Sequence, residues 1–193
     1  MALLTPAALA RLRAWGARLA ATVAAAACLA AAPAPEEYQV KAVFLFNFTQ
    51  FVEWPPEAFT DPTAPFVIGI LGRDPFGSAL DDAVRGEKVN GRPLVVRRYS
   101  RLSELKPCQI LFIDRSARGE AQKALAAVDR QRTLTVSDFA PGAERDVVIR
   151  FLTEDNKIRL RVNVDSAREA GLTISSKLLR PSQVVGTSAP SAP

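Results

Sequence analysis

The sequence predicts an α/β fold of three layers, in which helices flank a mostly parallel sheet and an antiparallel hairpin lies near the C-terminus. Two short runs are apolar throughout, FVIGIL at 66–71 and ILFI at 110–113, which is typical of strands buried on both faces of a parallel sheet. Segments with helical periodicity alternate with these runs along the chain. A later segment at 157–164 alternates apolar and polar residues, as expected of a strand with one solvent-exposed face.

Residues 1–31 are expected to be a signal peptide that precedes the folded domain. Three arginines lie in its first part with no acidic residue nearby, and an Ala-rich apolar stretch follows at 19–29. Small side chains around Ala30 and Ala31 suit cleavage, which would release the mature protein into the periplasm. Two alternatives stay open: an uncleaved membrane anchor, and a lipoprotein signal in which Cys28 becomes the acylated first residue.

The net charge does not indicate a nucleic-acid partner. The chain of 193 residues has a formal charge of +5, and the three arginines of residues 1–31 account for +3 of it, which leaves +2 for the remainder. Basic and acidic residues alternate along this remainder and form no concentrated basic face, so no nucleic acid is expected to bind.

The first element of the domain is predicted to be a helix that begins near Tyr38 and is ended by Trp54-Pro55-Pro56. The residue before a proline is disfavoured in the α conformation, and proline has no backbone N–H to donate. Polar residues such as Lys41 interrupt the apolar run, which favours a buried soluble helix over a membrane span. One face carries Val40, Val43, Phe44, Phe48, Phe51 and Val52, and a second apolar set, Ala42, Leu45 and Phe46, fills most of the opposite face, so the helix is expected to be buried nearly all round.

The next predicted unit is the strand at 66–71 followed by a helix. Gly72 is expected to end the strand, and Asp74 to cap a helix over 75–84 with Pro75 at its first position. The inner face of that helix is expected to carry Phe76, Leu80 and Val84.

Three further strands are predicted in this half of the chain. A turn at Asn90-Gly91 precedes the first of them, and Ser116 is expected to cap a helix that runs through Val128. The three strands are placed at 93–99, 108–113 and 133–137.

The C-terminal part is predicted to be an antiparallel hairpin at the edge of the sheet. Its strands are placed at 147–152 and 157–164, joined by a turn at 153–156. Asp165 is expected to cap a short helix, Gly171 to end it, and 172–179 to close the domain. The domain should therefore span 37–180, and the Ser/Pro/Ala-rich tail 181–193 should be disordered.

The inventory of reactive side chains indicates a protein that is not an enzyme. The chain has no histidine, which removes the commonest general base and metal ligand. Once residues 1–31 are removed, Cys108 is the only cysteine, so neither a cysteine pair nor a cysteine zinc site can form. No cofactor and no metal are expected. Cys108 is interpreted as a core thiol, with an intermolecular disulfide as the alternative.

Acidic residues at the ends of predicted strands define a candidate ligand pocket. Asp114 and Asp138 each follow a buried strand, and the carboxyl ends of parallel strands are where open α/β sheets place ligands. The stretch Gly72, Arg73 and Asp74 ends a third strand. The alternative is that these residues only form caps and turns. An acidic-residue hydrolase is the enzymatic alternative.

Four segments resemble the YfiR-like family and together cover nearly the whole mature domain. They are YQVKAVFLFNFTQFVEWP, IGILGRDPFGSALD, CQILFID and VNVDSAREAGLTISSKLLR. The resemblance implies an α/β fold and a periplasmic repressor that binds the sensor domain of a membrane-bound diguanylate cyclase. Such a repressor would hold down cyclic-di-GMP and thereby biofilm formation.

Two departures from that family bear on redox control. Members often carry a cysteine in the first strand, where this chain has Gly69, and Cys108 would be its partner. Many also have a further cysteine pair and a Gly-Gly segment, where this chain has Ala-Glu-Arg-Asp at 143–146. Control through disulfides is therefore not expected here.

Two functions of different classes follow. The first is a non-enzymatic regulator that contacts the periplasmic domain of a membrane protein, a diguanylate cyclase or another receptor, and that could also form a homodimer. A partner contact needs exposed apolar anchors, for which the sequence offers Trp54 with Pro55 and Leu178 with Leu179. Burial of these residues in the core is the alternative. The second function is a periplasmic small-molecule binding module that uses the pocket at Gly72, Arg73, Asp74, Asp114 and Asp138.

Overall fold

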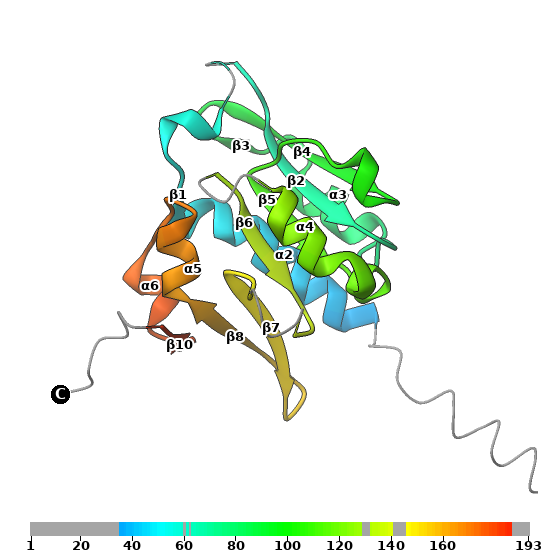
Figure 1. Ribbon diagram of the computed structural model, residues 1–193, viewed down its shortest axis with the longest axis vertical. Coiled ribbons are helices and arrows are strands. Elements are labelled where there is room, and N and C mark those ends of the chain that lie inside the picture. Colours follow the sequence, from blue (N-terminus) through cyan, green and yellow to red (C-terminus); the bar gives the residue numbers. More distant parts are fainter. Residues whose placement is uncertain (1–34, 60, 62, 129–131, 141–145, 187–193) are drawn as a thin grey trace, which may run out of the picture. The chain divides into compact units, whose positions relative to one another are not determined.

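The computed structural model describes residues 35–59, 61, 63–128, 132–140 and 146–186 (Figure 1). They form an eight-stranded sheet in the order β10-β8-β7-β6-β5-β2-β4-β3 and a separate two-stranded sheet, β1-β9. The strands are β1 Val52–Glu53, β2 Phe66–Leu71, β3 Lys88–Val89, β4 Arg92–Tyr99, β5 Ile110–Ile113, β6 Leu134–Ser137, β7 Ile149–Glu154, β8 Lys157–Asn163, β9 Thr173–Ile174 and β10 Gln183–Val185.

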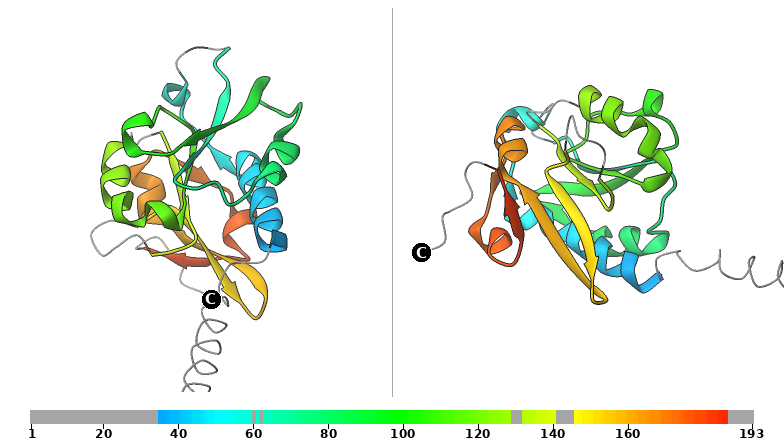
Figure 2. Two further views of the ribbon diagram at one scale, coloured as in Figure 1. Left: turned by 90° about the vertical axis from the view of Figure 1, so that its right-hand side faces the viewer. Right: turned by 60° about the horizontal axis from the view of Figure 1, so that its bottom comes forward.

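Helices cover both faces of the large sheet, as Figure 2 shows for α2 and α4. On β2, Phe66, Ile68 and Ile70 pack in the same core cluster as α2 and α3, whereas Val67 and Leu71 pack with α4. This alternation confirms the predicted three-layer α/β fold. The helices are α2 Pro35–Phe51, η1 Pro56–Ala58, α3 Ser78–Val84, η2 Leu102–Glu104, η3 Arg115–Glu120, α4 Ala121–Ala127, α5 Val164–Glu169 and α6 Ser176–Leu179.

The helix α2 is less completely buried than predicted, because one of its faces is open to solvent. Phe48 is fully buried as expected, but Val40 and Val43 are 46% and 51% exposed, and Lys41 is 2% exposed. The helix is apolar nearly all round, so periodicity alone does not select a face. Burial of Lys41 is compensated by ion pairs to Glu37 and Asp138. Residue 41 can therefore face the core, and this rotation leaves the two valines in solvent.

The end of α2 also lies earlier than predicted. The helix stops at Phe51, because Val52 and Glu53 leave it to pair with Ile174 and Thr173 in the β1-β9 sheet. The two prolines follow in a short 3-10 turn. Long-range strand pairing, which local sequence does not reveal, has overridden the helical pattern here.

Three predicted helix caps are corrected by the structure. Asp74 accepts a hydrogen bond from the Phe76 amide at 2.7 Å and so closes a turn, while α3 begins after Gly77. Asp114, and not Ser116, caps the next helix, by accepting from the Ser116 amide at 2.8 Å. The third cap is not Asp165 but a side chain two residues earlier, Asn163, which accepts from the amides of residues 165 and 166.

The C-terminal hairpin is antiparallel as predicted, but it is not the edge of the sheet. Its turn is the two-residue Asp155-Asn156, with φ of 49° and 58°, shorter than the predicted 153–156. A further strand, β10, pairs in parallel with β8 through Val184 and Val162. Residues 181–186 therefore belong to the folded domain, which corrects the predicted start of the disordered tail. Residues 187–193 and the predicted signal peptide lie outside the described residues.

Candidate functional site

A groove opens beside Trp54, at the start of β2. Its volume is about 440 Å³, and its lining comes from the end of α2, the β1 segment and the β3 turn: Thr49, Gln50, Val52, Glu53, Trp54, Phe59, Phe66, Lys88, Val89 and Asn90. The groove contains Trp54, which the sequence suggests as a contact residue, and polar and charged side chains surround it. A half-buried aromatic ring with a polar rim is the arrangement expected at a protein contact.

Trp54 is held rigidly in this groove. Its indole Nε1 donates to the carbonyl oxygen of Gln109 at 3.0 Å, and its ring meets Phe66 edge-to-face with 4.8 Å between centroids. Pro55 is likewise half-buried. Trp54 is therefore both a core residue at one edge and an accessible one at the other, so it fits both alternatives raised by the sequence.

Gln109, which sequence analysis did not single out, fixes the loop that carries Trp54. It is buried, and its side-chain oxygen accepts from the Val67 amide at 2.8 Å while its side-chain nitrogen donates to the Ala58 carbonyl at 2.6 Å. One amide thus links the loop after β1 to the starts of β2 and β5. The signal in the sequence is a single polar residue at the head of the apolar run CQILFI.

The structure brings together the ends of the first and the last of the four segments that resemble the YfiR-like family. Val52 pairs with Ile174, and the Ser175 amide donates to the Phe51 carbonyl at 2.8 Å, so α6 follows directly beside the end of α2. Leu178 on α6 is only 6% exposed and packs in the core, so it offers no exposed anchor. Leu179 is half-buried against the same core.

A second hollow lies at the carboxyl ends of β2, β4 and β5. Its volume is about 720 Å³, and it is lined by Gly72, Arg73, Asp74, Arg98, Ser100, Arg101, Ser116, Ala117, Gly119 and Glu120. The chain leaves β2 for β4 on one side and leaves β5 for β6 on the other. The hollow therefore sits at the point where the strand order reverses, which is the usual ligand position in open α/β sheets. We call it the strand-end pocket.

Of the five residues predicted to form a ligand pocket, three line the strand-end pocket: Gly72, Arg73 and Asp74. Asp114 is 7% exposed and serves as the cap of η3, as the turn-and-cap alternative expects. Asp138 does not line the pocket, because its side chain is bonded to Tyr38 and Lys41 of α2.

Asp138 belongs to a buried ionic cluster that anchors α2. Its Oδ2 accepts from the Tyr38 hydroxyl at 2.8 Å and from the Lys41 ammonium at 3.0 Å, and Lys41 also pairs with Glu37 at 2.7 Å. The pKa of Tyr38 is raised well above its usual range, mainly by burial and next by the hydrogen bond to Asp138, so the phenol stays protonated. Asp138 Oδ1 is buried without a hydrogen-bond partner. This cluster is an anchor and lines neither the groove nor the strand-end pocket.

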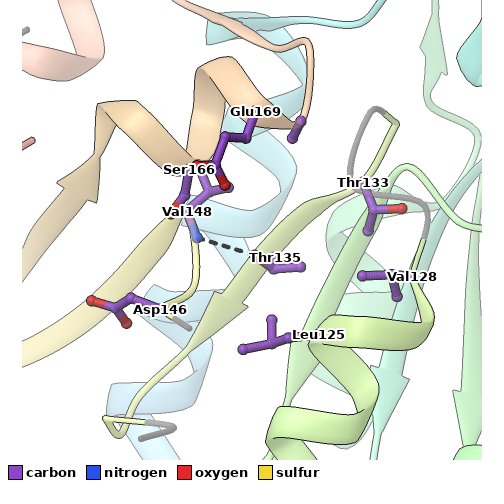
Figure 3. A pocket seen from close by; sticks show the side chains of 9 residues that line it. Leu125, Val128, Thr133, Thr135, Asp146, Val148, Ser166 and Glu169 are labelled. Atoms are coloured by element: carbon purple, nitrogen blue, oxygen red, sulfur yellow. Dashed lines mark hydrogen bonds between the residues drawn. The ribbon is translucent and has the colours of Figure 1, made fainter. Parts of the chain in front are cut away.

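A third, much smaller cavity lies where β6 and β7 diverge (Figure 3). The two strands share only two residue pairs, and the Val148 amide turns to donate to Thr135 Oγ1 at 3.0 Å. The cavity holds about 20 Å³, roughly the space of one water molecule. It is too small for an organic ligand.

The predicted core thiol lies opposite a glycine. Cys108 is 3% exposed and forms no disulfide, and a Cβ built on Gly69 would lie 3.1 Å from its sulfur. The family pairing expected from the resemblance therefore has the right neighbours, although this chain supplies only one of the two sulfurs. Burial raises the pKa of Cys108 from 9.0 to about 12, so the thiol is a poor nucleophile.

Within the described ranges, no cluster of three or more acidic or cysteine residues is placed to hold a metal ion. Across the same residues, none of the helices combines the length and apolarity that a membrane crossing requires. A search of curated proteins finds no match.

A comparison with protein families matches residues 38–183 to the family described as YfiR/HmsC-like. The matched stretch begins at Tyr38 in the buried ionic cluster and ends at Gln183, the first residue of β10, so it includes the Trp54 groove, the strand-end pocket and both sheets except the last two residues of β10. The chain belongs to the YfiR/HmsC-like family.

Proposed function

We propose that this protein is a periplasmic, non-enzymatic regulator that represses a membrane-bound diguanylate cyclase by binding the cyclase's periplasmic sensor domain. The observation that carries the proposal is the family match over 38–183. The absence of histidine from the chain supports a function through contact instead of catalysis. Export by residues 1–31 is part of the proposal, and N-terminal sequencing of the periplasmic fraction tests it: an intact Met1 would contradict export.

The proposed contact surface is the Trp54 groove together with the exposed face of α2. Val43, Asn47 and Gln50 follow one another at helical spacing, and Gln50 lines the groove. Val43 is 51% exposed, so it offers an exposed apolar side chain at helical spacing from Gln50. An apolar centre with a polar rim is the composition that protein contacts favour. Trp54, Pro55 and half-buried Leu179 stay candidates for this contact, and Leu178 does not.

Site-specific photocrosslinking in the periplasm tests the partner. A photoreactive residue at Gln50, on the proposed surface, is compared with one at Ala126, which is exposed on α4 at the other face of the sheet. We expect position 50 to crosslink to a membrane protein that carries a diguanylate cyclase domain, and position 126 not to do so.

A deletion strain provides the functional measurement. Loss of the protein should raise cellular cyclic-di-GMP, and re-expression should lower it again. Unchanged cyclic-di-GMP in the deletion strain, or equal crosslinking from positions 50 and 126, would contradict the proposal.

A further inference from the structure

We propose that the strand-end pocket binds a small organic molecule through its carboxylate or phosphate group. The site is separate from the Trp54 groove, since the two lie at opposite ends of β2, at Gly72 and at Phe66. The inference does not depend on the proposed repression, because it concerns only what this pocket recognises.

Some charged side chains of the pocket form ion pairs within the protein and others do not. Arg98 pairs with Asp74 at 2.7 Å and with Asp81 at 2.6 Å, and the hydrogen bond that Arg98 donates to Asp81 is the main cause that raises the pKa of Arg98. Of the two acidic residues of the lining, Asp74 accepts from Arg98 and from the Phe76 amide, whereas Glu120 accepts only a long hydrogen bond, from the Leu102 amide at 3.4 Å, so three arginines face two carboxylates in the lining.

Two arginines of the lining are left available. Among the described residues, Arg73 and Arg101 form no ion pair and no side-chain hydrogen bond, and both are exposed at the pocket. They come from different segments, after β2 and after β4, so the fold places two guanidinium groups around one hollow. A guanidinium binds carboxylate or phosphate oxygens in bidentate geometry, and two of them make an anion the expected ligand.

The backbone of the pocket is shaped for close approach. Gly72 has φ of +100°, and a Cβ there would lie 2.7 Å from Ser116 Oγ, so only glycine fits the end of β2. Ser116 Oγ accepts from the Arg73 amide at 2.8 Å, which ties the two rims of the pocket together and leaves its hydroxyl hydrogen free to donate. Ser100 adds a second hydroxyl. The volume of about 720 Å³ lies in the usual range for small-molecule sites.

Titration of the purified mature protein, followed through backbone amide resonances, tests the proposal. The probes are inorganic phosphate, phenyl phosphate, benzoate and the neutral benzyl alcohol. We expect saturable shifts at residues 72, 73 and 119 with the anionic probes and none with benzyl alcohol. Stronger binding of phenyl phosphate than of benzoate identifies a phosphoryl ligand, and the reverse order identifies a carboxylate.

Variants link the binding to the two arginines. Arg73→Ala with Arg101→Ala should weaken binding of the anions at least tenfold, whereas Arg159→Ala with Arg180→Ala, which removes the same charge elsewhere on the exposed surface, should not. Equal thermal midpoints of both double variants show that the fold is intact. Absence of saturable shifts, binding of benzyl alcohol as tight as that of benzoate, or equal weakening by the two double variants would each overturn the proposal.

Discussion

Phe48 is one of the residues through which α2 meets the C-terminal hairpin. It is fully buried, and its ring stacks on Phe151 of β7 with 6.0 Å between centroids, beside Phe44 at 6.3 Å. Phe48→Ala should lower the free energy of unfolding by about 3–5 kcal/mol, because it removes a buried ring and leaves a cavity. Chemical denaturation measures the change, and an unaltered midpoint would show that the hairpin and helix do not pack as described.

Cys108 should make the fold sensitive to alkaline pH. Its pKa is raised by burial from 9.0 to about 12, so above pH 9 the unfolded chain loses the thiol proton while the folded chain keeps it. Stability therefore falls with rising pH between about 9 and 12, and is unaffected by this group below that window. Between pH 9 and 10 the loss should be about 1 kcal/mol greater than in Cys108→Ala. Parallel slopes for the two proteins would contradict this expectation.

At the scale of elements, the attachment of α2 to the sheet depends on the buried ionic cluster. The side chains of Lys41 and Asp138 are 2% and 5% exposed, and one oxygen of Asp138 already lacks a partner. Lys41→Met should destabilise the protein by about 3–5 kcal/mol, because it leaves a carboxylate buried without its counter-charge.

Two companions to Lys41→Met separate charge from packing. Adding Asp138→Asn should recover part of the lost stability, since no buried negative charge then remains at that position. Lys177→Met, at an exposed lysine of α6, should change stability by less than about 0.5 kcal/mol. If Lys41→Met is as stable as the parent protein in urea denaturation, the cluster is not an anchor.

At the scale of the whole folded domain, stability and partner binding should be separable on α2. Val43 is 51% exposed, so a carboxylate at this position stays hydrated, and Val43→Glu should change the free energy of unfolding by less than about 0.5 kcal/mol. The same change should abolish repression, measured as a rise in cellular cyclic-di-GMP. Ala126→Glu on α4 is the matched control and should repress normally. A repressing Val43→Glu protein would move the contact surface away from α2.

The layers of this domain could be predicted from sequence because several of its strands can be recognised by their residue composition. The strands β2 and β5 are apolar on both faces, and the Asn90-Gly91 turn and the alternation in β8 were located correctly. Strand ends also suggest where a pocket opens, and Gly72, Arg73 and Asp74 line the hollow at the end of β2, whereas binding of a ligand there stays a prediction.

What could not be predicted depends on contacts between distant segments. Lys41 is buried because it pairs with Asp138, and α2 ends early because Val52 pairs with Ile174; both partners lie about a hundred residues away. The resulting orientation of the helix leaves Val43 exposed. The same holds for β10, whose three residues gain strand structure only by pairing with β8. Arg101 was missed as a pocket residue because only the fold brings it beside Arg73.

The position of β2 has a consequence for how a ligand and a partner would influence each other. Phe66 in the Trp54 groove and Gly72 in the strand-end pocket are six residue steps apart along β2, about 20 Å at the rise of a strand. Molecules at the two sites would therefore not touch, and any cooperation between them is a coupling free energy transmitted through β2 and its neighbours. Such coupling is reciprocal. A small molecule that lowers the affinity for the partner must itself bind the complex less tightly than it binds the free protein.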